Sequence, residues 1–257
     1  MGGDWTEDVR LLLERARKHQ REFNSLIWGD DQPRLWSIEE NQEKDGSYTY
    51  ALFVDQSRLK ELKPVVADLA NNLVHALDQL VGALARLHGH ERSHLYFPWA
   101  LGDAKFQRCL EKLKPFIGDN SVQEILTARE RQRFNLPHAQ LVKEVSNSSK
   151  HWELVPSRAS VMGIAVNRPG QPQQIWSVPD SDLDDYYYVF CNTTERMSGL
   201  PFQMLVGLRF FGLDSEIAAS PDTIFDCAFR YVEDVIKSVC GPDDATEGPS
   251  EVAVTGN

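Results

Sequence analysis

The chain has 257 residues, a net charge of −11, 42% hydrophobic and 25% charged residues, which is ordinary for a globular protein. No apolar run approaches the roughly 18–20 residues of a membrane-spanning helix, and the N-terminus lacks the basic and apolar regions of a secretion signal. Four widely spaced cysteines predict neither a disulfide framework nor a zinc knuckle, so we expect a cytoplasmic protein. The acidic balance disfavours non-specific nucleic-acid binding.

The N-terminal part of the sequence predicts a helix followed by a β-hairpin. Residues Thr6–Ile27 repeat apolar side chains at helical spacing, with Arg and Lys mostly on the opposite side. Two β-like runs follow at Leu35–Ile38 and Ser47–Val54. The dipeptide Asp45-Gly46 lies between them, and Asp-Gly at this place is typical of a hairpin turn.

The longest helical pattern covers Val65–His88, and Pro64 stands where a helix can begin. Its polar residues fall in one sector of the helix, and nearly all the others are Leu, Val or Ala. This polar stripe consists of Asp68, Asn71, Asn72, His75, Asp78, Gln79, Gly82 and Arg86. A helix that is apolar over about two thirds of its circumference is expected to be central and packed on several sides.

The remaining sequence predicts further helices and a second group of strands. Helices are expected at Asp103–Phe116 and, after a Gly118-Asp119-Asn120 break, at Ser121–Arg133. Two more are expected, one from Pro137 into the KEVSNSSKHWEL stretch (Lys143–Leu154) and one from Ser220-Pro221 onward. Ser121 and Glu124 have the spacing of a capping box. Runs of strand-like alternation cover Ser160–Asn167, Gln173–Val178, Tyr186–Asn192 and Met204–Phe211.

These elements predict a predominantly α member of the α+β class. We expect a helical bundle with a small antiparallel β insertion near the N-terminus and a second one before the last helix. Residues 1–240 are predicted to form a single domain. Residues 241–257 contain four acidic residues and no Lys or Arg, and we predict that they form a disordered acidic tail.

Three stretches resemble, in the same order, features of uncharacterised bacterial and phage helical proteins. The run ADLANNLVHALDQL at residues 67–80 resembles the motif G-D-x-L-H-N-L-R-S-A-L-D-H-L of those proteins. Phe97-Pro98 follows, as a Phe-Pro dipeptide does there, and VSNSSKH at residues 145–151 resembles a later S-N-x-D-K-H-R motif. Strands and a closing helix come after it in both. The resemblance implies a shared fold and says almost nothing about function.

The bundle also resembles the HEPN superfamily, in which some members are metal-independent ribonucleases with an R-x(4–6)-H motif. In the resembling proteins, the Arg and His of R-S-A-L-D-H have that spacing. Val74 and Gln79 occupy those positions here, and Trp152 replaces the Arg of K-H-R. If either motif is catalytic in such relatives, the resemblance implies that this chain has lost the groups that perform the reaction.

The first candidate site is a polar network between the central helix and the KEVSNSSKHWEL stretch. The six candidate residues are Asp68, Asn72, Asp78, Asn147, Lys150 and His151. They could be two solvated helix faces, with Lys150 and His151 favoured near a helix C-terminus by its dipole. They could instead pair across the bundle as a structural network, because buried polar groups need partners. A binding or catalytic site is the third alternative.

Two other clusters have the residue types of known sites. Arg133 and His138 have the R-x(4)-H spacing, in which the imidazole would transfer protons and the guanidinium would stabilise a charged phosphorane-like state. A solvated helix face that carries Arg129, Arg131 and Arg133 is the plain alternative. Three histidines, His88, His90 and His94, lie within seven residues and could bind a divalent ion, but they match no known ligand spacing and also suit an ordinary loop.

We therefore predict a non-enzymatic helical module that acts through protein contacts, through self-association or with another protein, and that uses no metal or cofactor. The HEPN-type ribonuclease is the alternative. Motifs for a phosphate-binding loop, a dinucleotide site, a serine nucleophile and a zinc protease are absent from the sequence. The aromatic run Tyr186–Phe190 is expected to be a strand, and it would form a contact surface if one face stays exposed.

Overall fold

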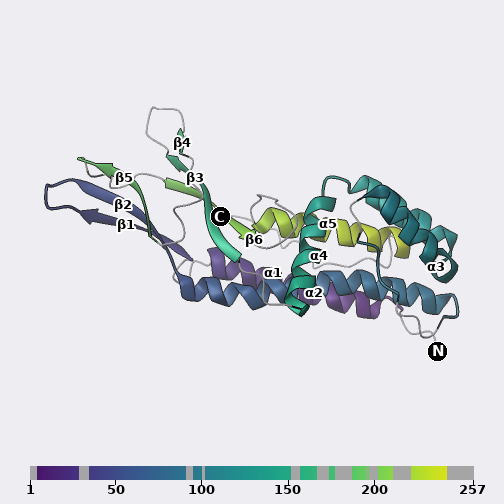
Figure 1. The fold of residues 1–257 in the computed structure, drawn as a ribbon. Coiled ribbons are helices and arrows are strands. Elements are labelled where there is room, and N and C mark those ends of the chain that lie inside the picture. The colour runs from purple at the N-terminus through teal and green to yellow at the C-terminus, as the bar shows by residue number, and fades with distance from the viewer. Residues whose placement is uncertain are drawn as a thin grey trace, which may run out of the picture. The chain divides into compact units, whose positions relative to one another are not determined.

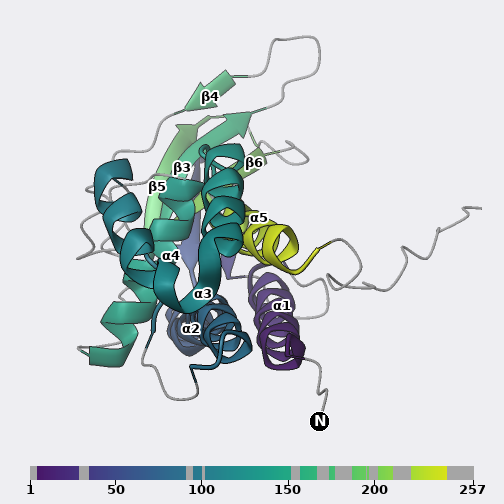
Figure 2. The same cartoon turned by 90° about the vertical axis from the view of Figure 1, so that its right-hand side faces the viewer.

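The structure is a computed structural model, and it describes residues 5–28, 35–90, 95–99, 102–151, 157–166, 174–176, 187–194, 196, 202–210 and 221–241. This part of the chain forms five helices and six strands (Figures 1 and 2). The helices are α1 (Glu7–Trp28), α2 (Gln56–Leu87), α3 (Asp103–Arg131), α4 (Leu136–His151) and α5 (Pro221–Cys240). The strands are β1 (Trp36–Gln42), β2 (Tyr48–Val54), β3 (Ser157–Val166), β4 (Gln174–Trp176), β5 (Tyr187–Thr193) and β6 (Phe202–Phe210).

The predicted class is confirmed at the level of a mainly helical protein with small antiparallel sheets. The chain divides into two compact units. Unit 1 contains residues 1–15, 72–140 and 227–257, and unit 2 contains residues 16–71 and 141–226. The single domain expected for residues 1–240 stays a prediction, and the predicted tail lies, apart from Gly241, outside the described residues. None of the described helices combines the length and apolar character that a membrane crossing requires.

Helix α2 begins at Gln56, so the predicted start at Pro64 is wrong. The side chain of Asp55 caps the helix, because its Oδ1 accepts the backbone N–H groups of Ser57 at 2.9 Å and Arg58 at 3.4 Å. Pro64 lies inside the helix on its exposed side. The predicted burial of the apolar sector is confirmed, with Leu77 fully buried.

Helix α3 is interrupted at Gly118, which confirms the predicted break. Gly118 has φ 81° and ψ 159°, a conformation that is essentially restricted to glycine. The helix resumes at once, so Ser121 lies inside the second arm and does not cap it as predicted. Helices α1, α4 and α5 begin within two residues of the predicted positions.

The strands form two three-stranded antiparallel sheets, in the orders β1-β2-β5 and β4-β3-β6. The predicted hairpin is confirmed: β1 pairs with β2, and Gly46 has φ 85° in the turn. Strand β5 pairs with β2, although about 130 residues separate them in sequence. The strands before the last helix therefore do not form one insertion, because β5 completes the N-terminal sheet.

Candidate functional site

The predicted polar stripe of α2 is only partly solvated. Asp68 and His75 are exposed, whereas Asn72 is buried with 9% of its surface accessible. Asp78 is half-buried, and its Oδ1 accepts the backbone N–H of Phe97 at 2.9 Å. Asp78 therefore holds the Phe-Pro segment against α2 within unit 1. Asp78 and the Phe97-Pro98 dipeptide were both recognised in the sequence as parts of one resemblance, but nothing in the sequence indicated that they contact each other.

On α4, Asn147 is exposed, and the side chains of Lys150 and His151 lie outside the described residues. The structural network, which was one of the three alternatives for these residues, stays a prediction. Helices α2 and α4 do meet through polar groups in unit 2, where the Oγ of fully buried Ser146 donates to Asn71 Oδ1 at 2.7 Å. Sequence reasoning missed Ser146, because a serine next to a polar helix face is usually solvated.

Arg133 and His138 have different surroundings. Arg133 is 66% exposed and contacts two carboxylates, that of Glu130 at 3.2 Å and that of Asp103 at 3.9 Å. His138 is half-buried at the start of α4, and burial lowers its pKa, while a hydrogen bond with the backbone of Phe134 partly offsets this. The two side chains thus have their own partners, and the carboxylates reduce the positive charge that Arg133 could offer a phosphate.

Two of the three clustered histidines pack against the kink of α3. The ring of His88 lies beside Gly118, so close that a Cβ at position 118 would be 2.9 Å from it. The ring of His90 meets that of Phe116 edge-on, with 5.0 Å between centroids. His94 lies outside the described residues. Among the residues that are described, no three His, Cys, Asp or Glu side chains are grouped to hold a metal ion.

A buried arginine forms the main electrostatic feature in unit 1. Arg129 is 5% exposed, contacts Asp103 at 3.1 Å and lies over the ring of Phe106, with 4.0 Å to the centroid. Burial raises the pKa of the neighbouring Tyr231 to about 12, against the opposing effect of the positive charge and hydrogen bond of Arg129. Phe97 contacts the Tyr231 ring, which joins the segment held by Asp78 to this centre.

Sequence reasoning missed this centre because it assigned Arg129 to a solvated, arginine-rich face. Its neighbours in sequence, Arg131 and Arg133, are indeed exposed. Only the contacts of Arg129 with residues from the first turns of α3 and from α5 explain its burial. The centre has the features of a packing device, because the guanidinium and the aromatic rings around it are buried, while the Asp103 carboxylate that pairs with it stays exposed.

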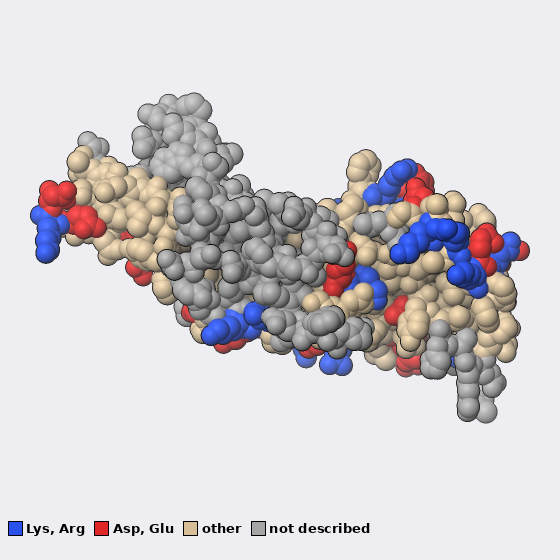
Figure 3. All heavy atoms as spheres, viewed as in Figure 1, with Lys and Arg blue, Asp and Glu red and all other residues tan. Residues whose placement is uncertain are grey.

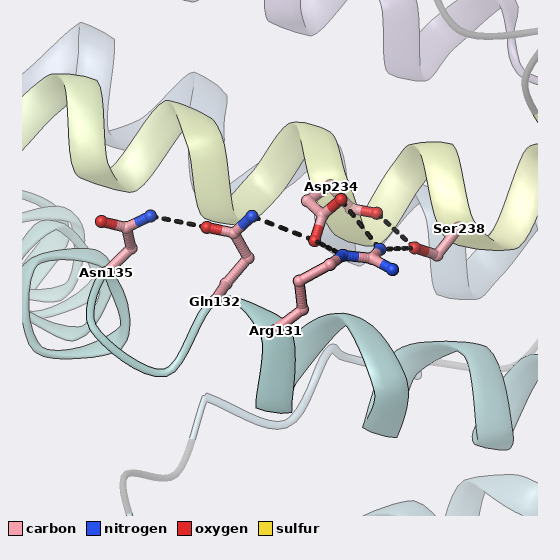
Figure 4. A network of polar contacts seen from close by, with 5 residues as sticks. All are labelled: Arg131, Gln132, Asn135, Asp234 and Ser238. Atoms are coloured by element: carbon pink, nitrogen blue, oxygen red, sulfur yellow. Dashed lines mark hydrogen bonds and ion pairs between the residues drawn. The ribbon is translucent and has the colours of Figure 1, made fainter.

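A second polar cluster fastens the end of α3 to α5 (Figure 4). Arg131 donates from Nε and Nη2 to the two carboxylate oxygens of Asp234, both at 2.8 Å, and Nη2 also donates to Ser238 Oγ at 2.6 Å. Gln132 donates to Asp234 at 3.1 Å, and Asn135 donates to Gln132 at 2.5 Å. The paired geometry raises the pKa of Arg131, first through the hydrogen bond with Asp234. This cluster therefore has the chemistry of a structural clamp.

One face of the sheet β1-β2-β5 exposes large apolar side chains. Phe53 and Tyr187 are cross-strand partners and are both 40% exposed. Val189, which pairs with Ala51 on the same face, is 48% exposed. Figure 3 shows that the described surface over these strands is largely uncharged away from the hairpin tip. The sequence left open whether one face of the aromatic strand stays exposed, and Tyr187 and Val189 are exposed in the structure.

No protein-family model matches the chain, and neither curated proteins nor solved structures gave a match.

Proposed function

We propose that this chain is a non-enzymatic interaction module that works through protein contacts, and that two copies associate through the sheet β1-β2-β5. The observation that carries the proposal is the exposed apolar group Phe53, Tyr187 and Val189. Large side chains that stay exposed together on a flat sheet face are characteristic of contact surfaces. The resemblance to bacterial and phage helical proteins and to HEPN bundles is part of the same proposal.

Self-association is the form of contact that the charge distribution favours at this face. The chain has a net charge of −11, so two copies repel each other over most surfaces. The exposed apolar group is itself uncharged, with Glu39 of β1 beside Ala51 on the same face, so the repulsion at this group is weaker than over a highly charged surface. A two-fold dimer, the commonest symmetry of soluble oligomers, would also place the same apolar group on both sides of the contact.

Sedimentation velocity over a range of concentrations tests this proposal. We expect the wild type to move from the 29.2 kDa monomer toward a dimer as concentration rises. The double variant Phe53→Ser/Val189→Thr should weaken the dimer by about tenfold or more, because a few buried apolar side chains usually dominate a contact. Phe134→Ser removes an apolar side chain that is 93% exposed in unit 1, and this control should dimerise as the wild type does.

A wild type that stays monomeric at all concentrations would contradict self-association. Equal weakening by the double variant and by Phe134→Ser would contradict the choice of this face. Circular dichroism of each variant would confirm that the sheet still forms.

The ribonuclease alternative has its own measurement. The lowered pKa of His138 favours a neutral imidazole, which can accept a proton, and this is the observation in its favour. The two carboxylates beside Arg133 count against it. Metal-independent cleavage of single-stranded RNA that disappears in His138→Gln and in Arg133→Gln would establish the alternative. We expect no cleavage by the wild type.

A further inference from the structure

Between the two arms of α3 lies an open groove of about 940 Å³. It exists because Gly118 turns the second arm away from the direction of the first. Its apolar floor comes from both arms, with Cys109 and Leu110 on the first and Val122 and Leu126 on the second. Leu110 and Val122 are buried, whereas Cys109 and Leu126 remain partly accessible, so the described chain leaves part of the floor open.

The rim of this groove is positively charged. Lys105, Arg108 and Lys112 line it and are all exposed, and among the described lining residues only Glu111 is acidic. The three cations follow one another at i, i+3 and i+7, so they form a row along one side of the first arm. Within the described residues, none of the three forms an ion pair with a carboxylate. Figure 3 shows Lys and Arg side chains gathered over α3.

We propose that this groove binds an amphipathic helical segment of a partner protein that carries acidic residues along one flank. The apolar floor would receive the apolar side of that segment, and the row of Lys105, Arg108 and Lys112 would face its carboxylates. Helix-in-groove binding has this pattern, with apolar anchors at i, i+3, i+4 and i+7. The inference rests on the proposed function, because it names a partner class for an interaction module.

The same features disfavour a nucleic acid as the occupant. A phosphate backbone requires a broad positive surface, and this chain has an overall charge of −11. The three cations lie on one rim of the groove only. The floor beside them is apolar, and phosphate groups form no favourable contact with apolar side chains. Charge complementarity with a carboxylate-bearing helix therefore accounts for both parts of the groove, and it sets specificity and association rate more than affinity.

The inference can be tested by selection from a displayed library of random helical peptides against the full chain, followed by fluorescence anisotropy with the enriched peptides. We expect the enriched peptides to be acidic with leucines at helical spacing. Their affinity should fall by about tenfold or more in Lys105→Gln/Arg108→Gln/Lys112→Gln. It should also weaken when the salt concentration is raised to about 0.5 M, because salt screens exposed charges.

The matched control is Lys18→Gln/Arg21→Gln/Lys60→Gln, which removes three exposed cations outside the groove and changes the net charge equally. This control should bind the peptides as the wild type does. The inference is overturned if no peptide is enriched, if the enriched peptides are not acidic, or if both triple variants lose affinity equally.

The peptide titration tests the groove and the sedimentation experiment tests self-association, so either result can be negative without the other. A monomeric protein that binds acidic peptides through the α3 groove removes only self-association from the proposed function. Copies that associate through the sheet but ignore every peptide remove only the groove.

Discussion

Asp78 and Phe97 are joined by a hydrogen bond of 2.9 Å from the backbone N–H of Phe97 to the carboxylate of Asp78. The bond fixes the segment that contains Phe97 against the C-terminal half of α2. Phe97 in turn packs its buried ring against Phe106 and Tyr231. The Asp78 carboxylate thereby positions a ring that contacts the two aromatic residues beside the buried Arg129.

Replacing Asp78 by Ala should destabilise the protein by about 1–3 kcal/mol, because the half-buried N–H of Phe97 would lose its acceptor. Urea denaturation followed by circular dichroism measures the change. Gln79→Ala is the control on the next, exposed position of α2, and it should alter stability by no more than about 0.5 kcal/mol. Equal effects of the two substitutions would show that the Asp78 bond contributes nothing specific.

Leu77→Ala should cost about 2–5 kcal/mol, because Leu77 is fully buried and its removal leaves a cavity in the packing of α2. Leu87→Ala makes the same chemical change at the end of the same helix, where the side chain is 58% exposed, and should cost far less. Denaturant midpoints of the two variants provide the comparison. A loss below about 0.5 kcal/mol for Leu77→Ala would remove this face of α2 from the core.

Tyr231 should make the protein less stable in alkaline solution. Its folded-state pKa is about 12, above the value of about 10 in an unfolded chain, so the folded protein keeps a proton that the unfolded chain releases. The free energy of unfolding should therefore fall between these values, by about 1.4 kcal/mol for each pH unit.

Tyr231→Phe reports the contribution of every other titrating group. We expect the stability of the wild type relative to this variant to decline from about pH 9 to about pH 11 in urea denaturation. A difference that stays constant over this range would mean that Tyr231 ionises in the folded protein as it does in the unfolded chain.

The clamp between Arg131 and Asp234 should show energetic coupling in a double-mutant cycle. We expect an interaction of about 1 kcal/mol between Arg131→Met and Asp234→Ala, because the pair is bidentate and Asp234 is only 18% exposed. The control pair Arg133 and Glu130 is 66% and 73% exposed, and its coupling should stay below about 0.5 kcal/mol. Additive effects at Arg131 and Asp234 would reduce the clamp to a surface contact.

Periodicity was sufficient to predict the elements, whereas their ends depended on competing local signals. The break at Gly118 was predictable because glycine was followed by Asp119 and Asn120, all unfavourable inside a helix. The start of α2 was not, because two signals competed. The cap at Asp55 starts the helix. Leu62 and Val65, which lie on either side of Pro64, are buried, and their burial favours a continuous helix although Pro64 has no backbone N–H to donate.

The candidate sites were less predictable, because they depend on which distant residues meet. Arg129 resembles its exposed neighbours in every local property, and its burial depends on distant partners such as Asp103, 26 residues earlier, and Tyr231. The bond between Ser146 and Asn71 joins residues 75 positions apart. The polar stripe of α2 was correctly identified as unusual, yet the sequence contained no signal that Asp78 binds a backbone N–H.

The division of the chain into two units also has a consequence for synthesis on the ribosome. Within the described residues, unit 1 combines residues 5–15 with residues 72–140 and 227–241, and unit 2 combines residues 16–71 with residues between 141 and 226. Neither unit can close until most of the polypeptide has emerged, since each is assembled from separate stretches. The apolar faces of α1 and α2 therefore stay exposed on the nascent chain until much later residues have been translated. Such an exposed apolar surface favours binding to chaperones during synthesis.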